Sequence, residues 1–133
     1  MLIHIPVAVA ELFDKVSILE IKLRHLVDPK RRQHAKSELD ELMQITKQHG
    51  LLDFLETSLY RQLLETNQAL WDVCEVRRQL ELAGQFDQDF IEKSRLEYKT
   101  NDLRASLKQQ INARFGSTIV EVKSYQRFSH ESK

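Results

Sequence analysis

The stretch EYKTNDLRASLKQQIN, residues 97–112, decides the fold because it carries the pattern of a long helix. Its apolar residues recur at steps of four and seven, which places them on one side of an α-helix. Asp87 can cap this helix at its start, and Gly116 can end it. The pattern predicts a helix from about residue 88 to residue 114. Its predicted core side consists of Leu96, Leu103, Leu107 and Ile111.

A second side of this helix is neither plainly apolar nor plainly charged. It contains Ile91, Ser94, Tyr98, Asn101, Ala105, Lys108 and Asn112. The amide and hydroxyl groups on this side need hydrogen-bonding partners wherever they are buried. We favour an internal polar network with a neighbouring helix, because most buried polar groups find partners within the protein. The alternative is a ligand site in which Arg104 and Lys108 bind an anion and the two amides orient it.

The preceding segment predicts a second long helix. Apolar residues recur at helical spacing from Leu52 to Ala83, and Gly84 supplies a stop signal. Because only a few residues join the two helices, they must run antiparallel as a helical hairpin. We interpret Trp71, the only tryptophan of the chain, as a core anchor in preference to a binding platform. Near one line of this helix lie Leu64, Asn67, Trp71, Glu75 and Arg78.

The first half of the chain predicts a shorter hairpin. Its first helix is expected at about residues 8–27. Its second helix begins with Asp28 as the cap and Pro29 in the first turn, and ends at Gly50. Charged residues crowd around the apolar seam of the first helix, and we interpret them as a solvated flank with ion pairs. These residues are Asp14, Lys15, Glu20 and Lys22.

The two chain ends differ in character from the helices. Residues 118–123 are rich in β-branched residues, and LIHI at residues 2–5 is similar. An isolated strand leaves its backbone unpaired, so we expect the two ends to pair in a small ribbon beside the helices. The predicted fold class is therefore an all-α antiparallel bundle of about four helices, in a single domain over residues 1–125. Residues 126–133 are expected to form a disordered tail.

Composition excludes several classes of partner. The 20 Lys and Arg residues balance the 20 Asp and Glu residues, so no net field gathers nucleic acid or an anionic membrane. No apolar run reaches the roughly 18 residues of a membrane span, and the start of the chain lacks the pattern of a signal peptide. Cys74 is the only cysteine and cannot form an internal disulfide. We therefore expect a cytoplasmic protein that binds neither nucleic acid nor a membrane.

Motifs for metal and cofactor chemistry are missing from the sequence. The five histidines lack the short spacings that bring zinc ligands together, and each of the three glycines stands alone rather than in a phosphate-binding loop. We therefore expect no metal site and no cofactor. Two enzyme comparisons stay open, a magnesium site and a cationic clamp for a dicarboxylate. The first would use Glu11 and Asp14 with Glu38 and Glu41, and the second Arg104, Lys108, Lys15 and Lys22.

Four segments together resemble a family of small uncharacterised bacterial proteins of about this length. They are ELFDKVSILEIKL at residues 11–23, LWDVCEVRR at 70–78, FDQDFIEKSRLEYKTNDLRASLKQQIN at 86–112 and IVEVKSY at 119–125. The resemblance spans nearly the whole chain, and the third segment is the most specific. It implies no established activity, but it implies a setting near proteins that handle sugars and cell-surface polysaccharide. The chain departs from the family pattern near Cys74, where an acidic residue is expected.

The sequence and the resemblance together predict a cytoplasmic binding or interaction module, linked to sugar or polysaccharide metabolism. The alternative is a small all-α enzyme that acts on a phosphorylated, sugar-linked or dicarboxylate substrate. The expected partners are a protein or a small anionic ligand. We also expect the long hairpin to bury its second face, which is partly apolar and partly polar, against another copy of the chain in a homo-oligomer. The sequence identifies no catalytic residue. The candidate ligand-binding residues are Tyr98, Asn101, Arg104, Lys108, Asn112, Trp71, Glu75, Lys15 and Lys22.

Overall fold

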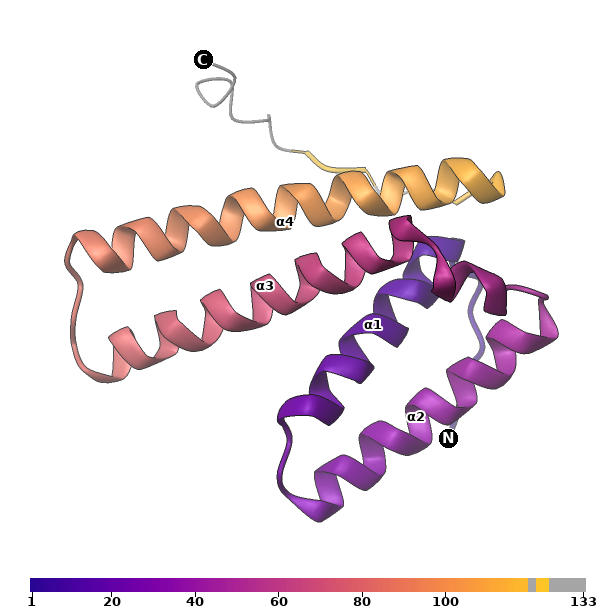
Figure 1. The fold of residues 1–133 in the computed structure, drawn as a ribbon, viewed down its shortest axis with the longest axis horizontal. Coiled ribbons are helices and arrows are strands. Elements are labelled where there is room, and N and C mark those ends of the chain that lie inside the picture. Colours follow the sequence, from indigo (N-terminus) through magenta and orange to yellow (C-terminus); the bar gives the residue numbers. More distant parts are fainter. Residues whose placement is uncertain (120–121, 125–133) are drawn as a thin grey trace.

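The chain folds into α-helices, which confirms the predicted all-α bundle (Figure 1). The structure is a computed structural model that describes residues 1–119 and 122–124. Its elements are α1 (Val9–His25), α2 (Pro29–Gln48), the short 3₁₀ helix η1 (Leu52–Glu56), α3 (Ser58–Leu82) and α4 (Gln88–Phe115).

Two helical hairpins make up the molecule, as predicted. α1 packs with α2, and α3 packs along α4 (Figure 1). The predicted caps are present, since the Asp28 side chain accepts a hydrogen bond from the backbone N–H of Arg31 and the Asp87 side chain accepts one from that of Phe90. Gly116 ends α4 with a φ of 62°, a left-handed conformation that glycine adopts without strain. These boundary residues set the lengths of the helices.

α1 is the central element of the fold. It contacts α2, α3 and α4, whereas α2 makes no contact with α3 or α4 in the described part of the chain. The short hairpin lies beside one end of the long hairpin, and the tip of the long hairpin projects past it (Figure 1). No residue from 74 to 106 is fully buried. The core cluster consists of Ala10, Phe13, Val16, Phe54, Tyr60, Leu63, Leu107 and Ile111.

Two of the four residues predicted for the core side of α4 lie outside the core. Leu107 and Ile111 are buried, but Leu96 is 46% exposed and Leu103 is 52% exposed. The prediction is wrong for these two leucines because α1 packs against a different side of α4. In the described part of the chain, no helix covers the side that carries Leu96 and Leu103.

The long helix predicted from Leu52 to Ala83 is interrupted. The 3₁₀ helix ends at Glu56, and α3 begins after Thr57. Thr57 Oγ1 accepts a hydrogen bond from the backbone N–H of Tyr60 at 3.3 Å and so caps α3. The break turns Phe54 into the core, where its ring centroid lies 4.4 Å from that of Phe13.

The predicted ribbon between the chain ends is not found among the described residues. Residues 1–8 form neither helix nor strand, and the described residues of segment 118–123 carry no strand. Residues 120 and 121 of that segment lie outside the described residues, and so does the predicted tail at 126–133. None of the helices described is both long and apolar enough to cross a membrane.

Candidate functional site

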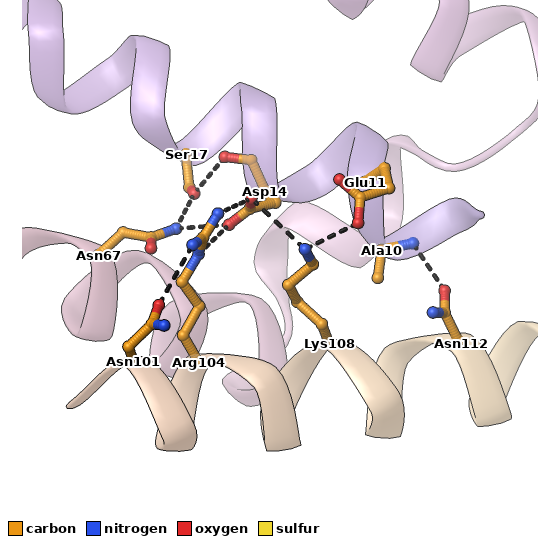
Figure 2. A network of polar contacts seen from close by, with 9 residues as sticks. All are labelled: Ala10, Glu11, Asp14, Ser17, Asn67, Asn101, Arg104, Lys108 and Asn112. Carbon is orange, nitrogen blue, oxygen red and sulfur yellow. Dashed lines mark hydrogen bonds and ion pairs between the residues drawn. The ribbon is translucent and has the colours of Figure 1, made fainter. Parts of the chain in front are cut away.

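A buried carboxylate, Asp14, lies where α1 meets α3 and α4 (Figure 2). Asn67 of α3 donates from Nδ2 to Asp14 Oδ1 at 2.9 Å, and Arg104 of α4 donates from Nε to the same oxygen at 3.0 Å. Arg104 Nη2 also donates to Asp14 Oδ2, so the guanidinium binds both carboxylate oxygens. Asn67 Nδ2 further donates to Ser17 Oγ at 2.8 Å. One carboxylate therefore joins three helices.

Lys108 adds a second buried cation to this network. Its Nζ lies 2.7 Å from Glu11 Oε1 and 3.8 Å from Asp14 Oδ2, and the residue is only 8% exposed (Figure 2). Buried charges are tolerated where they are paired. Among the described residues, the two cations Arg104 and Lys108 are paired with the two carboxylates of Asp14 and Glu11.

The first turn of α1 depends on α4 and on Ser117, which lies two residues past the end of α4. The N-cap position of α1 is Ala8, which has no side-chain oxygen to accept from the free backbone N–H groups. Instead, Asn112 Oδ1 accepts from the backbone N–H of Ala10 at 2.9 Å, and Ser117 Oγ accepts from that of Val9 at 3.2 Å. The carboxyl-terminal part of the chain therefore supplies the missing cap.

Burial and hydrogen bonding oppose one another at Asp14. Burial alone would raise the pKa of its carboxyl, but hydrogen bonds from Arg104 and Asn67 and the charges of Arg104 and Lys108 hold the pKa below its usual range. Asp14 is therefore a structural anion and not a proton donor at neutral pH. Burial and the neighbouring Glu20 raise the pKa of Tyr60, whose hydroxyl donates to Glu20 Oε1 at 3.2 Å.

The side of α4 that is neither plainly apolar nor plainly charged has one part that contacts α1 and one part that is exposed. Arg104, Lys108 and Asn112 are engaged by α1, and Asn101 Oδ1 accepts from Arg104 Nη1 at 3.4 Å. Tyr98 is 63% exposed. The part near α1 is the internal polar network that the sequence favoured, and its cations already hold carboxylates.

Trp71 does not anchor the core, which corrects the preferred interpretation of this residue. Its ring stacks on that of His25, with centroids 5.1 Å apart, and it lines an open groove of about 340 Å³. Cys74 lines the same groove and is half-buried. Four of the five residues predicted near one line of the second long helix therefore form the α3 wall of this groove. Its lining residues are Ile18, Ile21, Asn67, Leu70, Trp71, Cys74, Glu75, Arg78 and Arg104.

The lysines predicted on α1 do not join the cations of α4. Lys15 Nζ lies 3.2 Å from Glu38 Oε1 of α2, and Lys22 is exposed. The four-cation clamp for a dicarboxylate is therefore not assembled. The magnesium site considered from the sequence is not assembled either, because Glu11 binds Lys108 and Asp14 binds Arg104. Among the residues that the structure describes, no group of three or more His, Cys, Asp and Glu side chains could hold a metal ion.

Sequence reasoning missed the role of Asp14, which it placed in a solvated flank. The interpretation is wrong for Asp14 because α1 has two buried sides, one against α2 and one against the long hairpin. The signal was a second set of positions at steps of four, three and four along α1. These positions are Ala10, Asp14, Ser17 and Ile21, and all four are buried.

The fold and the network define an all-α protein of two hairpins, joined by a buried ion-pair network and carrying an open groove beside it. The chain matches a family of unknown function, DUF6165, over residues 3–131, and it belongs to that family. This confirms the resemblance to an uncharacterised family. No curated protein and no solved structure matches the chain.

Proposed function

We propose that the protein is a non-catalytic binding module whose groove between α1 and α3 takes an anionic sugar. The observation that carries the proposal is the set of groups on the α3 wall of the groove, Trp71, Glu75 and Arg78. Ligand sites combine apolar walls with a few convergent polar groups. Here Ile18 and Ile21 supply apolar wall, and the three side chains of α3 supply an aromatic ring, an acceptor and a cation.

Each of these three side chains suits one part of such a ligand. An indole ring packs well on the apolar face of a sugar ring and keeps one N–H donor at its edge. The Glu75 carboxylate accepts hydrogen bonds from hydroxyl groups, and the Arg78 guanidinium binds a carboxylate or phosphate through two parallel donors. Within the described residues, neither Glu75 nor Arg78 is held in an ion pair.

The same geometry disfavours the enzyme alternative. A small enzyme acting on an anionic substrate would use Arg104 and Lys108, but both cations are bound to carboxylates of α1. The link to sugar and polysaccharide metabolism is an expectation from the family resemblance, and the groove is compatible with it. The lone Cys74 favours a reducing compartment, so we place the module in the cytoplasm.

Tryptophan fluorescence tests the proposal directly, because Trp71 is the only tryptophan and lines the groove. We would titrate the protein with glucuronate, glucose 1-phosphate, glucose and inorganic phosphate. The expected result is a saturable change with the anionic sugars, a weaker change with glucose, and at least about tenfold weaker binding of the anionic sugars by Arg78→Ala. Arg95→Ala is the matched control, since Arg95 is an exposed arginine of α4 that does not line the groove. Equal binding by Arg78→Ala, or no change with any sugar, would reject the proposal.

A further inference from the structure

A histidine from α1 covers part of the tryptophan that lines the groove. His25 is the last residue of α1, and its ring stacks on the Trp71 ring of α3 with the ring planes 15° apart and the centroids 5.1 Å apart. Trp71 is half-buried and lines the groove, whereas His25 is exposed and is not one of the described residues that line it. His25 can therefore act on a ligand in the groove only through Trp71, and its ring is open to protons from the solvent.

A hydrogen bond from Gln68 of α3 holds the His25 ring in this stack. Nε2 of Gln68 lies 3.0 Å from Nε2 of His25. The same amide nitrogen donates to Oδ1 of Asp72 at 3.0 Å, and Oε1 of Gln68 accepts from Nη1 of Arg24 at 3.4 Å. These two further contacts fix the orientation of the amide, because its nitrogen faces an anion and its oxygen faces a cation.

The orientation of the amide decides which form of His25 fits beside it. An amide nitrogen is a donor only, so Nε2 of His25 has to accept the hydrogen bond and carries no proton. The neutral imidazole meets this condition with its proton on Nδ1, whereas the imidazolium would place a second donor against the first. Histidine is the side chain whose charge ordinarily changes between pH 5 and pH 8. The contact with Gln68 therefore requires neutral His25 and is lost on acidification.

Turning the Gln68 amide over does not rescue this contact. The amide oxygen could then accept from the imidazolium, but the same turn would set that oxygen against the carboxylate of Asp72. It would also set the amide nitrogen, a donor, against the guanidinium of Arg24. Two contacts would be broken in order to keep one. We therefore expect the protonated ring to leave the amide and to uncover the indole of Trp71.

The charged groups beside the stacked pair of His25 and Trp71 belong to three helices. They are Lys22 and Arg24 of α1, Arg32 of α2, whose guanidinium donates to backbone carbonyls at the end of α1, and Asp72 and Glu75 of α3. Cations and carboxylates occur together here, and salt partly screens charges that are exposed. The indole face itself attracts a cation, which favours a stack with the imidazolium. The hydrogen bond from Gln68 acts in the opposite direction and is backed by the two contacts that fix the amide.

We propose that His25 positions Trp71 for the ligand and makes binding in the groove sensitive to pH. This inference rests on the proposed function, because it concerns the same groove. Neutral His25 holds the indole in place, and protonation releases it. The charge that His25 gains does not compensate, because Arg78, the cation proposed to bind the anion, lies seven residues or about 10 Å along α3 from Trp71. Salt screens an exposed charge strongly at that distance, so anionic sugars bind more weakly in mild acid.

Tryptophan emission without ligand tests the stacked pair by itself. Between pH 8 and pH 5.5 the emission of the wild type is expected to shift to longer wavelength, because the uncovered indole meets more water. His25→Phe keeps an aromatic ring on Trp71 but carries no group that titrates, so its emission should not shift. His34→Phe is the matched control, because His34 is an exposed histidine of α2, and it should shift as the wild type does. A wild type without the shift, or an equal shift in His25→Phe, would overturn the proposal.

Gln68→Glu tests the direction of the hydrogen bond. A carboxylate accepts from the imidazolium and also from the neutral ring with its proton on Nε2, so both forms of His25 can stay beside it. The shift in acid should therefore be absent from this variant. A shift as large as that of the wild type would show that the Gln68 amide does not select the neutral ring, and the proposal would fail.

Calorimetric titration with glucuronate tests the effect on the groove, because a carboxylate of this kind stays ionised from pH 8 to pH 5.5. The wild type is expected to bind about threefold more weakly at pH 5.5 than at pH 8, which is the loss of one hydrogen bond. His25→Phe should bind equally at both pH values, and His25→Ala should bind weakly at both. Equal affinity of the wild type at the two pH values would reject this inference alone. No binding of glucuronate at either pH would reject the proposed function, and the regulation of the groove with it.

Discussion

Asp14 and Arg104 are 90 residues apart in the chain, and the guanidinium of Arg104 donates to both oxygens of the Asp14 carboxylate. This pair ties the first helix to the last, and Asn67 ties both to α3. Two parallel hydrogen bonds restrict the orientation of the planar guanidinium against the carboxylate, so the pair restrains how α1 lies on the long hairpin as well as its distance. At Asp14 the polar network therefore joins α1 to the long hairpin, whereas apolar packing does so elsewhere along α1.

Removing the carboxylate should destabilise the fold strongly. Asp14→Ala removes the buried carboxylate that binds Arg104 and lies beside Lys108, and breaking one partner of a buried pair costs about 3 to 5 kcal/mol of unfolding free energy. Urea denaturation followed by circular dichroism measures this loss. Lys15→Ala is the control from the next position, because the ion pair of Lys15 is exposed and should contribute little. Equal effects of the two substitutions would show that the network does not hold α1 in place.

Lys108 should also act as a structural residue. Lys108→Ala leaves Glu11 without its cation and weakens the field at Asp14, so we expect a loss of about 1 to 3 kcal/mol in unfolding free energy. Fluorescence titration with anionic sugars should give the same affinity as the wild type, because Lys108 does not line the Trp71 groove. A stable variant that loses ligand binding would instead return Lys108 to the ligand site considered from the sequence.

Stability should fall in acid because of Asp14. The pKa of this carboxyl is held below its ordinary value near 3.8, so the unfolded chain binds the proton more readily than the folded chain does. The stabilising contribution is complete above that ordinary pKa and is lost as the pH falls from about 5 toward the lower folded value. Urea midpoints measured between pH 7 and pH 2.5 would show this decline. The decline should be shallower in Asp14→Asn, and equal slopes in the two proteins would contradict the assignment.

Local sequence signals predicted the helical frame well because they act over one or two turns. Asp28 and Asp87 cap their helices, and Gly116 ends the last one with a left-handed backbone. The hairpins follow from the short connections between helices. Thr57 was overlooked because threonine also occurs inside helices, and only the packing of Phe54 against Phe13 shows why the chain breaks there.

The candidate site was less predictable because its contacts join distant parts of the chain. The sequence marked Arg104, Lys108 and Asn112 as residues that need a neighbour, but periodicity could not show that α1 would supply it. Asp14 was read as solvated because charged residues usually are. Leu96 and Leu103 were placed in the core because apolar residues on one side of a helix usually pack against a neighbour. The pattern does not show which element, if any, covers that side.

The cap that Asn112 provides should contribute measurably to stability. Its Oδ1 accepts from the backbone N–H of Ala10 at 2.9 Å, at a helix start whose own N-cap residue, Ala8, offers no side-chain acceptor. Losing a side-chain cap costs about 0.5 to 2 kcal/mol, and here the N–H is also buried, so Asn112→Ala should fall at the upper end of that range. Gln109→Ala removes an exposed amide from the same helix and should change the unfolding free energy little. Hydrogen exchange gives a second measurement, because the amide of Ala10 should lose protection in Asn112→Ala and keep it in Gln109→Ala. Unchanged protection in Asn112→Ala would mean that α1 begins without this cap.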